Sequence, residues 1–228
     1  MRTFAISDIH GCCRSFESLL QKIGFEKSDE LFLLGDYIDR GPASKGVFDL
    51  ILKLKEENYK VQCLLGNHEE MMLHALHHPA SSEAYSWKIW NGGIETLKSF
   101  GTGLVKNIDP KYLEFIYSLP RFIEKDRFIF VHAGLNFSIP DPFADEESML
   151  WAFDDRPVVN IPWLSGRIVV HGHRIHPREQ IKDDIGRLDT YPILGIDNGC
   201  VYQKKRYNHL YAVELHTMEL SFQKNIDT

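Results

Sequence analysis

Six side chains of this sequence are of types that bind divalent metal ions, and all of them follow short apolar segments. They are Asp8, His10, Asp36, Asn67, His132 and His171, with His68 and Asp39 beside them. Imidazole, carboxylate and amide ligands together suit manganese, iron, cobalt or zinc, and the lack of thiolates in the set argues against a structural zinc site. Six ligands are enough for two metals. Two ions bridged by one carboxylate would lie about 3.5–4 Å apart and activate a water between them, which is the two-metal solution for hydrolysing phosphate esters.

The segments that precede these residues have the length and composition of β-strands. They are residues 4–6, 31–34, 61–65, 128–131 and 167–170. Each segment ends in a cluster of Asp, Asn, His or Gly residues. Because open α/β sheets bind their ligands at the carboxyl ends of the strands, we expect the five clusters to converge on one site.

Helical spacing appears between the predicted strands. Apolar residues recur at i, i+3, i+4 and i+7 from Phe16 to Ile23, and Gly24 follows as a C′ residue, which predicts a βαβ crossover. Further helices are predicted over residues 44–58, from about residue 69, and over residues 109–119. After this last helix, residues 193–201 and 209–215 have the pattern of strands. The order predicts an α/β core followed by a strand-rich C-terminal part, in a single domain over residues 1–228.

The composition excludes several classes of protein. The chain has 228 residues, of which 43% are hydrophobic and 25% charged, and its apolar runs are far shorter than the ~20 residues of a membrane span. A net charge of −6 without a Lys/Arg cluster large enough to form a basic face argues against a nucleic-acid partner, and an anionic substrate would need help from metals. The N-terminus lacks a secretory signal pattern, and the four cysteines are too scattered for a disulfide framework. We therefore expect a cytoplasmic protein with reduced thiols that binds neither membranes nor nucleic acids.

Five short motifs occur in order between residues 7 and 173. They are Asp8-Ile9-His10-Gly11, Gly35-Asp36-Tyr37-Ile38-Asp39-Arg40-Gly41, Gly66-Asn67-His68-Glu69, His132-Ala133-Gly134 and His171-Gly172-His173. In this respect the sequence resembles the phosphoprotein phosphatase family of calcineurin-like metallophosphoesterases, and most of all the family's small bacterial and phage members. The resemblance implies an α/β fold, with a central β-sandwich of mixed sheets flanked by helices and a dimetal site at the strand carboxyl ends.

The resemblance also implies a role for each motif residue. The first metal would be held by Asp8, His10 and Asp36, and the second by Asp36, Asn67, His132 and His171. Both ions would be divalent, with manganese as the first candidate and iron or zinc as alternatives. His68 would protonate the leaving oxygen, Asp39 would orient His68, and Arg40 would clamp the phosphate.

The sequence departs from the family pattern in several places. Ser7 stands where the first motif usually has Gly, and Phe153 stands where a second phosphate-binding arginine is usual. Either Arg156 or Arg174 could replace that arginine, and the sequence does not choose between them. Two other groups of residues have simpler explanations than a binding site. The tryptophans 87, 90 and 151 could line a substrate pocket but are more simply core residues, and the histidines 74, 77 and 78 could bind a metal but are more simply a solvated helix end.

Two substrate classes fit these features. The leading prediction is a phosphatase of phosphoserine and phosphothreonine proteins or peptides, with phosphotyrosine as a further substrate, that uses direct attack by a metal-bridging hydroxide. The alternative is a dinucleoside polyphosphate hydrolase of the diadenosine tetraphosphatase type. Glu69 and residues 90–93 favour the phosphatase by resemblance. A degenerate protein that only binds phosphorylated partners is disfavoured, because all the expected ligands and His68 are present.

Overall fold

The computed structural model describes residues 1–152, 154 and 156–228, so Phe153 lies outside the described residues. The first half of the chain contains β1 (Thr3–Ile6), α1 (Cys13–Lys22), β2 (Glu30–Leu33), α2 (Ser44–Glu56), β3 (Lys60–Cys63), α3 (Asn67–His77), α4 (Ser82–Trp90), α5 (Gly93–Ser99) and α6 (Pro110–Tyr117). The second half contains β4 (Phe122–Lys125), β5 (Phe128–Val131), α7 (Glu146–Trp151), α8 (Ile161–Leu164), β6 (Ile168–His171), α9 (Arg178–Ile185), β7 (Ile193–Gly195), β8 (His209–Glu214) and β9 (Glu219–Lys224). Short 3₁₀ turns occupy Val105–Asn107 and Pro142–Ala144.

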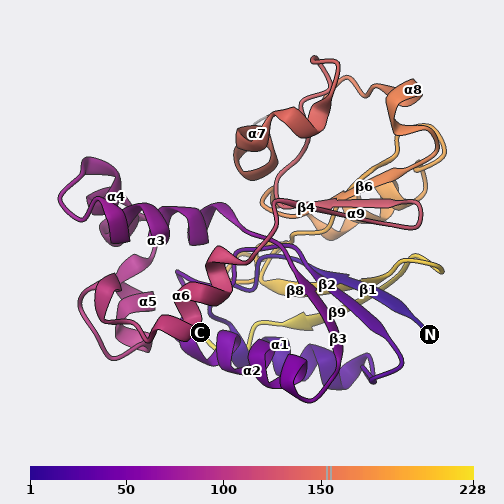
Figure 1. The fold of residues 1–228 in the computed structure, drawn as a ribbon. Coiled ribbons are helices and arrows are strands. Elements are labelled where there is room, and N and C mark those ends of the chain that lie inside the picture. The colour runs from indigo at the N-terminus through magenta and orange to yellow at the C-terminus, as the bar shows by residue number, and fades with distance from the viewer. Residues whose placement is uncertain (153, 155) are drawn as a thin grey trace.

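The strands form two mixed sheets. One has the order β3-β2-β1-β8-β9, in which β1, β2 and β3 are parallel and β8 is antiparallel to both of its neighbours, β1 and β9. The other has the order β4-β5-β6-β7, in which only the β4–β5 pair is antiparallel. The predicted α/β sandwich of mixed sheets flanked by helices is therefore confirmed (Figure 1).

The two sheets pack face to face through an apolar layer. Phe32 of β2 stacks on Phe130 of β5 with ring centroids 4.1 Å apart, and both rings are buried. Ala5 and Val213 of the five-stranded sheet share this core with Val170 and Leu194 of the other sheet. Strands from both halves of the chain thus form one interior, which fixes the strand ends relative to one another.

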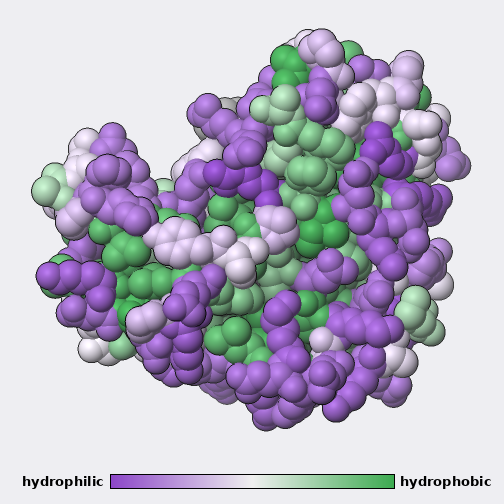
Figure 2. Space-filling view, viewed as in Figure 1, coloured by the Kyte–Doolittle hydropathy of each residue, from purple (hydrophilic) through white to green (hydrophobic). Residues whose placement is uncertain are grey.

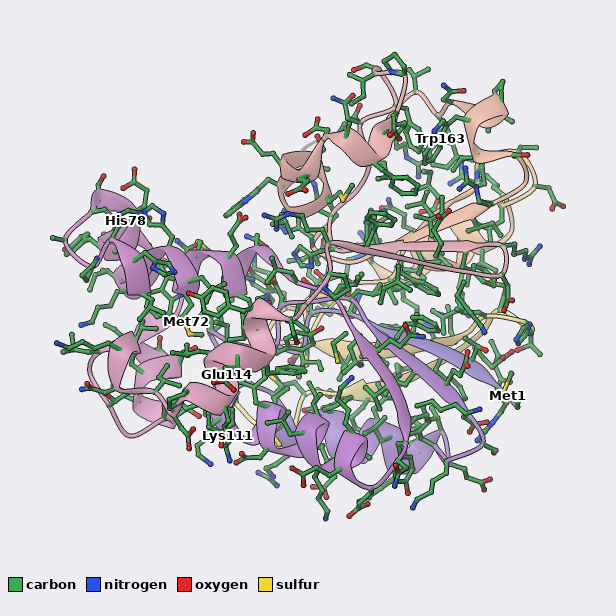
Figure 3. All side chains as sticks on the ribbon, viewed as in Figure 1. Met1, Met72, His78, Lys111, Glu114 and Trp163 are labelled. Carbon is green, nitrogen blue, oxygen red and sulfur yellow. The ribbon has the colours of Figure 1, made fainter. Side chains whose placement is uncertain are left out.

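A second core lies between the five-stranded sheet and its helices. Buried residues of α1 and α2, such as Phe16 and Phe48, pack against the sheet, while the solvent-facing sides of these helices form the hydrophilic lower surface in Figure 2. In Figure 3, Met72 of α3 faces α5 and α6, where it joins the same core as Tyr112 and Ile116. Helices α3 to α6 therefore form a lobe beside the carboxyl ends of the parallel strands.

The five strands predicted before the site clusters and the four predicted helices are present, with bounds shifted by at most three residues. The helix expected from about Glu69 begins at Asn67, and Asp109 caps α6 as its sequence suggests. The strand expected over residues 193–201 is wrong beyond Gly195, because the Asp197 carboxylate accepts the backbone N–H of Gly199 at 2.7 Å and Gly199 has a φ of +66°.

The strand-rich C-terminal part is also wrong in one respect, because α7, α8 and α9 follow α6. These helices have six, four and eight residues, so they are too short to show a clear helical period. Helices α4 and α5 were likewise not predicted from the sequence. Among the described residues, no helix combines the length and apolar character that crossing a membrane requires.

Candidate dimetal active site

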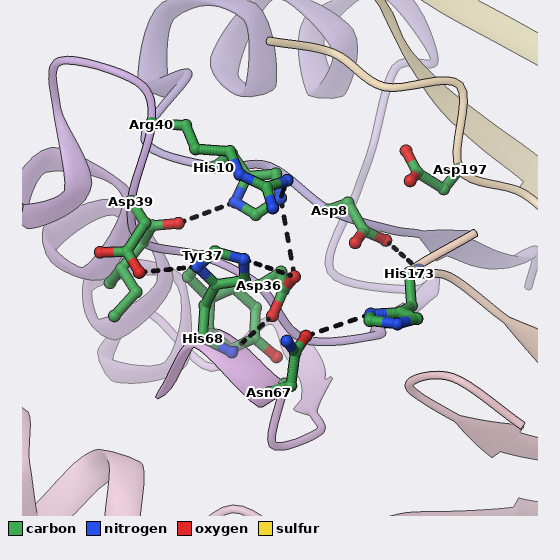
Figure 4. Close-up of polar contacts among 12 residues, drawn as sticks. Asp8, His10, Asp36, Tyr37, Asp39, Arg40, Asn67, His68, His173 and Asp197 are labelled. Atoms are coloured by element: carbon green, nitrogen blue, oxygen red, sulfur yellow. Dashed lines mark hydrogen bonds and ion pairs between the residues drawn. The ribbon is translucent and has the colours of Figure 1, made fainter. Parts of the chain in front are cut away.

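The polar clusters meet at the carboxyl ends of the central strands, as predicted (Figure 4). Asp8 follows β1, Asp36 follows β2, Asn67 follows β3 and His132 follows β5. Six non-glycine residues of these loops adopt positive φ angles: Asp8, His10, Asp36, Asp39, Arg40 and His173. A side chain in this conformation is strained by about 1–3 kcal/mol, and such residues concentrate at functional sites. The surrounding contacts must therefore hold the loops in place.

His10, Asp36 and His68 form the first group of ligand atoms that lie within 4.8 Å of one another. The Nδ1 atom of His10 donates to the carbonyl oxygen of Ile38 at 2.9 Å. This bond leaves the lone pair on Nε2, which lies 3.6 Å from an Asp36 carboxylate oxygen. His10 is thus held in the tautomer that a metal ligand needs.

Asp36, His132 and His173 form the second group. Nδ1 of His132 donates to the carbonyl oxygen of Leu34 at 2.8 Å, so its Nε2 is also an acceptor, 3.5 Å from Asp36. Nε2 of His132 and Nδ1 of His173 lie 2.9 and 3.1 Å from the side-chain oxygen of Asn67. Because lone pairs of His132, Asn67 and Asp36 converge without a proton between them, the position suits a cation. Asp36 belongs to both groups.

The structure brings His173, and not the predicted His171, into these groups of the described residues. His171 is still part of β6, where it pairs with Gly195, and its ring lies 6.1 Å from that of His176. The positive φ of His173 turns the chain after the strand, so that its backbone N–H donates to Asp8 at 2.9 Å and its ring reaches Asn67. The predicted strand end at Val170 was one residue short, so His171 still belongs to the strand and the histidine of this group comes from the turn that follows it.

The electrostatics of the site also favour cations. Asp8, Asp36 and Asp197 are all buried. Burial, with added repulsion from Asp197 and Asp36, raises the pKa of Asp8 well above its usual range, and burial raises the pKa of Asp197 to about 7. Burial lowers the pKa of His10 and of His132, so both imidazoles are neutral at pH 7. Neutral imidazoles around crowded carboxylates fit a pair of divalent cations.

His68 and Asp39 form a hydrogen-bonded pair beside the first group, in the arrangement predicted from the sequence. Nδ1 of His68 lies 2.7 Å from Oδ2 of Asp39, which is fully buried. The indole N–H of Trp87 donates to the same oxygen at 2.7 Å, and the hydroxyl of Thr96 donates to Oδ1 at 2.6 Å. Trp87 is buried as expected for a core residue, but neither its contact with Asp39 nor a role for Thr96 at the site was predicted from the sequence.

Glu69 fixes the loop that carries Asp36. Its carboxylate is buried and accepts hydrogen bonds from the backbone N–H groups of Asp36, Tyr37, Ile38 and Gly66, at 2.9–3.2 Å. Four N–H groups around one carboxylate offset part of the strain of the positive φ angle at Asp36. Glu69 therefore shapes the site from behind, without facing the ligand groups.

The three predicted phosphate-binding arginines lie in different surroundings. Arg40 lies at the site, where its guanidinium donates to Nε2 of His10 at 2.8 Å. Arg174 follows His173 and donates to the carbonyl oxygen of Ala152 at 3.1 Å. Arg156 instead pairs with Asp184 of α9 at 3.3 Å, and about half of its side chain is exposed. The geometry thus favours Arg40 and Arg174 over Arg156.

A sandwich of two mixed sheets whose strand ends carry two histidine and carboxylate groups sharing one aspartate defines the metallophosphoesterase class of proteins. The chain belongs to the calcineurin-like phosphoesterase family, whose sequence profile matches residues 1–204.

Known relatives extend this comparison. Over 142 residues, the chain is 34% identical to the symmetrical bis(5'-nucleosyl)-tetraphosphatase of Nitrosomonas europaea, covering 61% of this chain and 47% of that protein. Over 136 residues it is 35% identical to the enzyme of the same name from Methylobacillus flagellatus, covering 59% and 44%. The chain thus spans less than half the length of these relatives. A solved Saccharomyces cerevisiae serine/threonine phosphatase with similarity to human PP5 shares the fold, with a TM-score of 0.69, 16% identity and coverage of 100% of this chain and 81% of that one.

Proposed function

We propose that this protein is a dimetal phosphohydrolase that cleaves dinucleoside polyphosphates of the diadenosine tetraphosphate type. The observation that carries the hydrolytic chemistry is the pair of ligand groups that share Asp36, with the His68–Asp39 pair beside them. The substrate class rests on the similarity to symmetrical tetraphosphatases. These relatives support the alternative of the sequence analysis better than the phosphoprotein substrate that was predicted first.

Asp8, His10 and Asp36 would hold one cation, and Asp36, Asn67, His132 and His173 the other, with His173 taking the role predicted for His171. The bound cations would supply an activated water and positive charge for the phosphate. Manganese remains the first candidate, with iron or zinc as alternatives. Arg40 and Arg174 would bind phosphate oxygens through their guanidinium groups.

His68 would donate a proton to the leaving oxygen. Asp39 accepts the proton on Nδ1, so the opposite nitrogen, Nε2, faces the ligand groups and lies 3.9 Å from Asp36. A positioned acid of this kind typically contributes about 10²–10⁴-fold to a rate. Trp87 and Thr96 would keep Asp39 ionised and aligned, since each donates to one of its oxygens.

The phosphoprotein substrate is the second candidate, but the sequence features that favoured it have another explanation. Glu69 accepts hydrogen bonds from backbone N–H groups around Asp36. This support of the Asp36 loop would be needed whichever substrate the site binds. Residues 90–93 form the turn between α4 and α5, where Gly92 has a φ of +97° and packs against Arg40. Neither feature distinguishes a phosphopeptide from a nucleotide.

Initial rates of the manganese-loaded protein on diadenosine tetraphosphate and on a phosphoserine peptide would test the proposal. We expect faster turnover of the dinucleotide, and near-complete loss of both activities in Asp36→Asn. Preference for the peptide would restore the first prediction of the sequence analysis. Turnover of neither substrate, in a protein that binds manganese, would refute the hydrolase assignment.

A further inference from the structure

A pocket of about 680 Å³ opens between α3, α4 and α7. Its walls are formed by Glu70, Met71, Leu73, His74, His77, His78, Glu83, Ser86, Asn91 and Trp151. Figure 2 shows the surface hollowed between the lobe of α3 and α4 and the lobe of α7, and Figure 3 places His78 at the outer end of α3. The volume lies in the range of about 300–1,000 Å³ that is usual for small-molecule sites.

The pocket lies next to the metal-ligand groups. The Trp151 ring lines it and lies 6.4 Å from the ring of His173, measured between centroids. The indole N–H of Trp151 donates to Glu70 at 2.9 Å, and Glu70 is two residues from His68 on the same helix. A substrate with its phosphate at the ligand groups could therefore extend directly into this pocket.

The charges of the lining indicate which part of a substrate it would accept. Of the described residues that line it, none is lysine or arginine, whereas Glu70 and Glu83 are acidic. A phosphate group would be repelled here and is better placed at Arg40 and the cations. A neutral group with amine donors would instead find the carboxylate of Glu83, whereas that of Glu70 already accepts from Trp151 and pairs with Arg121 at 3.3 Å.

The walls also suit a flat aromatic group. Met71 and Leu73 supply apolar surface, and Trp151 is a large ring on which a base can stack. Stacking of a nucleobase on an aromatic side chain contributes substantially to affinity in proteins that bind single-stranded nucleic acids. Asn91 is held by the carbonyl oxygen of Ser86 at 3.2 Å, which gives the rim a fixed polar group.

We propose that this pocket binds one nucleoside of the substrate, with the base stacked on Trp151 and the phosphate chain running to the ligand groups. The inference rests on the proposed function, because it assigns the position of the nucleoside in that reaction. The histidines 74, 77 and 78, first explained as a solvated helix end, would then form the rim of a substrate pocket.

Filling the pocket tests this inference. Met71→Trp and Ser86→Phe place bulk on its two opposite helices, and Ile89→Trp adds the same bulk to an exposed position of α4 outside the lining. We expect both filling variants to lose about tenfold in kcat/KM on diadenosine tetraphosphate, mainly through KM, because they displace a stacked base. Turnover of p-nitrophenyl phosphate, which has no nucleoside, should stay within about twofold in all three variants.

Equilibrium binding of AMP separates the two proposals, because it does not depend on turnover. If the wild type fails to cleave the dinucleotide yet binds AMP, and the filling variants weaken that binding, the proposed function fails and the nucleoside pocket stands. If the dinucleotide is cleaved equally well by wild type and both filling variants, the pocket assignment is overturned and the function stands. The pocket assignment is also overturned if the filling variants slow the turnover of a phosphoserine peptide and leave the binding of AMP unchanged.

Discussion

Replacing Thr96 with valine should weaken the acid catalyst of this site without touching a metal ligand. The Thr96 hydroxyl donates to Oδ1 of Asp39 at 2.6 Å and accepts the Asp39 backbone N–H at 2.8 Å. Valine has nearly the same volume but lacks both bonds. Thr96→Ser keeps the hydroxyl and is the matched control.

The size of the effect follows from the partners that remain. Losing a hydrogen bond to a buried carboxylate costs about 1.5–3 kcal/mol, so we expect Thr96→Val to lower the free energy of unfolding by about 2–3 kcal/mol. His68 and Trp87 still donate to Asp39, so the carboxylate stays near its position and only part of the acid catalysis is lost. We expect kcat to fall about tenfold on a substrate with a poor leaving group.

The dependence on the leaving group provides the assay. Phenyl phosphate needs a proton on its departing oxygen far more than p-nitrophenyl phosphate does, so Thr96→Val should slow the first much more than the second.

The pH dependence of kcat is a second readout. Burial raises the pKa of Asp39, while hydrogen bonds from His68, Thr96 and Trp87 lower it. Without the Thr96 donor the pKa of Asp39 rises further, and the acidic limb of kcat should move to higher pH. Equal losses on both aryl phosphates, or equal activities of Thr96→Val and Thr96→Ser, would refute the reasoning.

Three further outcomes are expected. His173→Ala should weaken manganese binding at least about tenfold by calorimetry, whereas His171→Ala should leave it nearly unchanged, because only His173 reaches Asn67. Glu69→Gln should lower the thermal midpoint of the metal-free protein as well as activity, because four backbone N–H groups lose their shared carboxylate. Burial raises the pKa of Asp29, but the hydrogen bonds and charge of Arg2 and the backbone N–H of Glu26 together outweigh it and lower the pKa. The stabilisation that the Asp29 carboxylate gives the fold is therefore complete at pH 7 and is lost as the pH falls below about 4. The difference in urea midpoint between wild type and Asp29→Asn should therefore be constant above about pH 5 and narrow as the pH falls below about 4; a constant gap down to low pH would contradict this.

Those parts of the site that depend on strand ends were predictable from the sequence. Asp8, Asp36 and Asn67 each follow an apolar segment of the parallel strands β1, β2 and β3, which end at the same edge of one sheet. The convergence of these three residues follows from that topology and needs no knowledge of their detailed contacts. His132 follows β5 of the other sheet, so its place beside them depends on how the two sheets pack.

The parts that depend on long-range contacts were not predictable. Thr96 lies 57 residues from Asp39 in the chain, and nothing in the spacing of the two shows that α5 packs behind the loop that carries Asp39. The choice between His171 and His173 depended on where β6 ends, because His171 still belongs to the strand whereas the positive φ of His173 turns its side chain to the site. Strand ends are the feature that a local sequence pattern predicts least accurately. The ligand after β6 was therefore predicted as His171, whereas His173 reaches the site.

The contacts that sequence patterns missed are also those that keep the ligand loops in place. Asp8, Asp36 and Asp197 repel one another in a buried space, and several ligand loops adopt strained positive φ angles. Glu69, Trp87 and Thr96 oppose this by donating to or accepting from the loops that carry Asp36 and Asp39. These contacts hold the ligand atoms close together, and a bound cation would relieve the repulsion between the carboxylates. Metal binding should consequently stabilise the fold as well as activate the enzyme. Glu69, Trp87 and Thr96 matter for the same reason, because they maintain an arrangement of ligands that the charges of the site oppose.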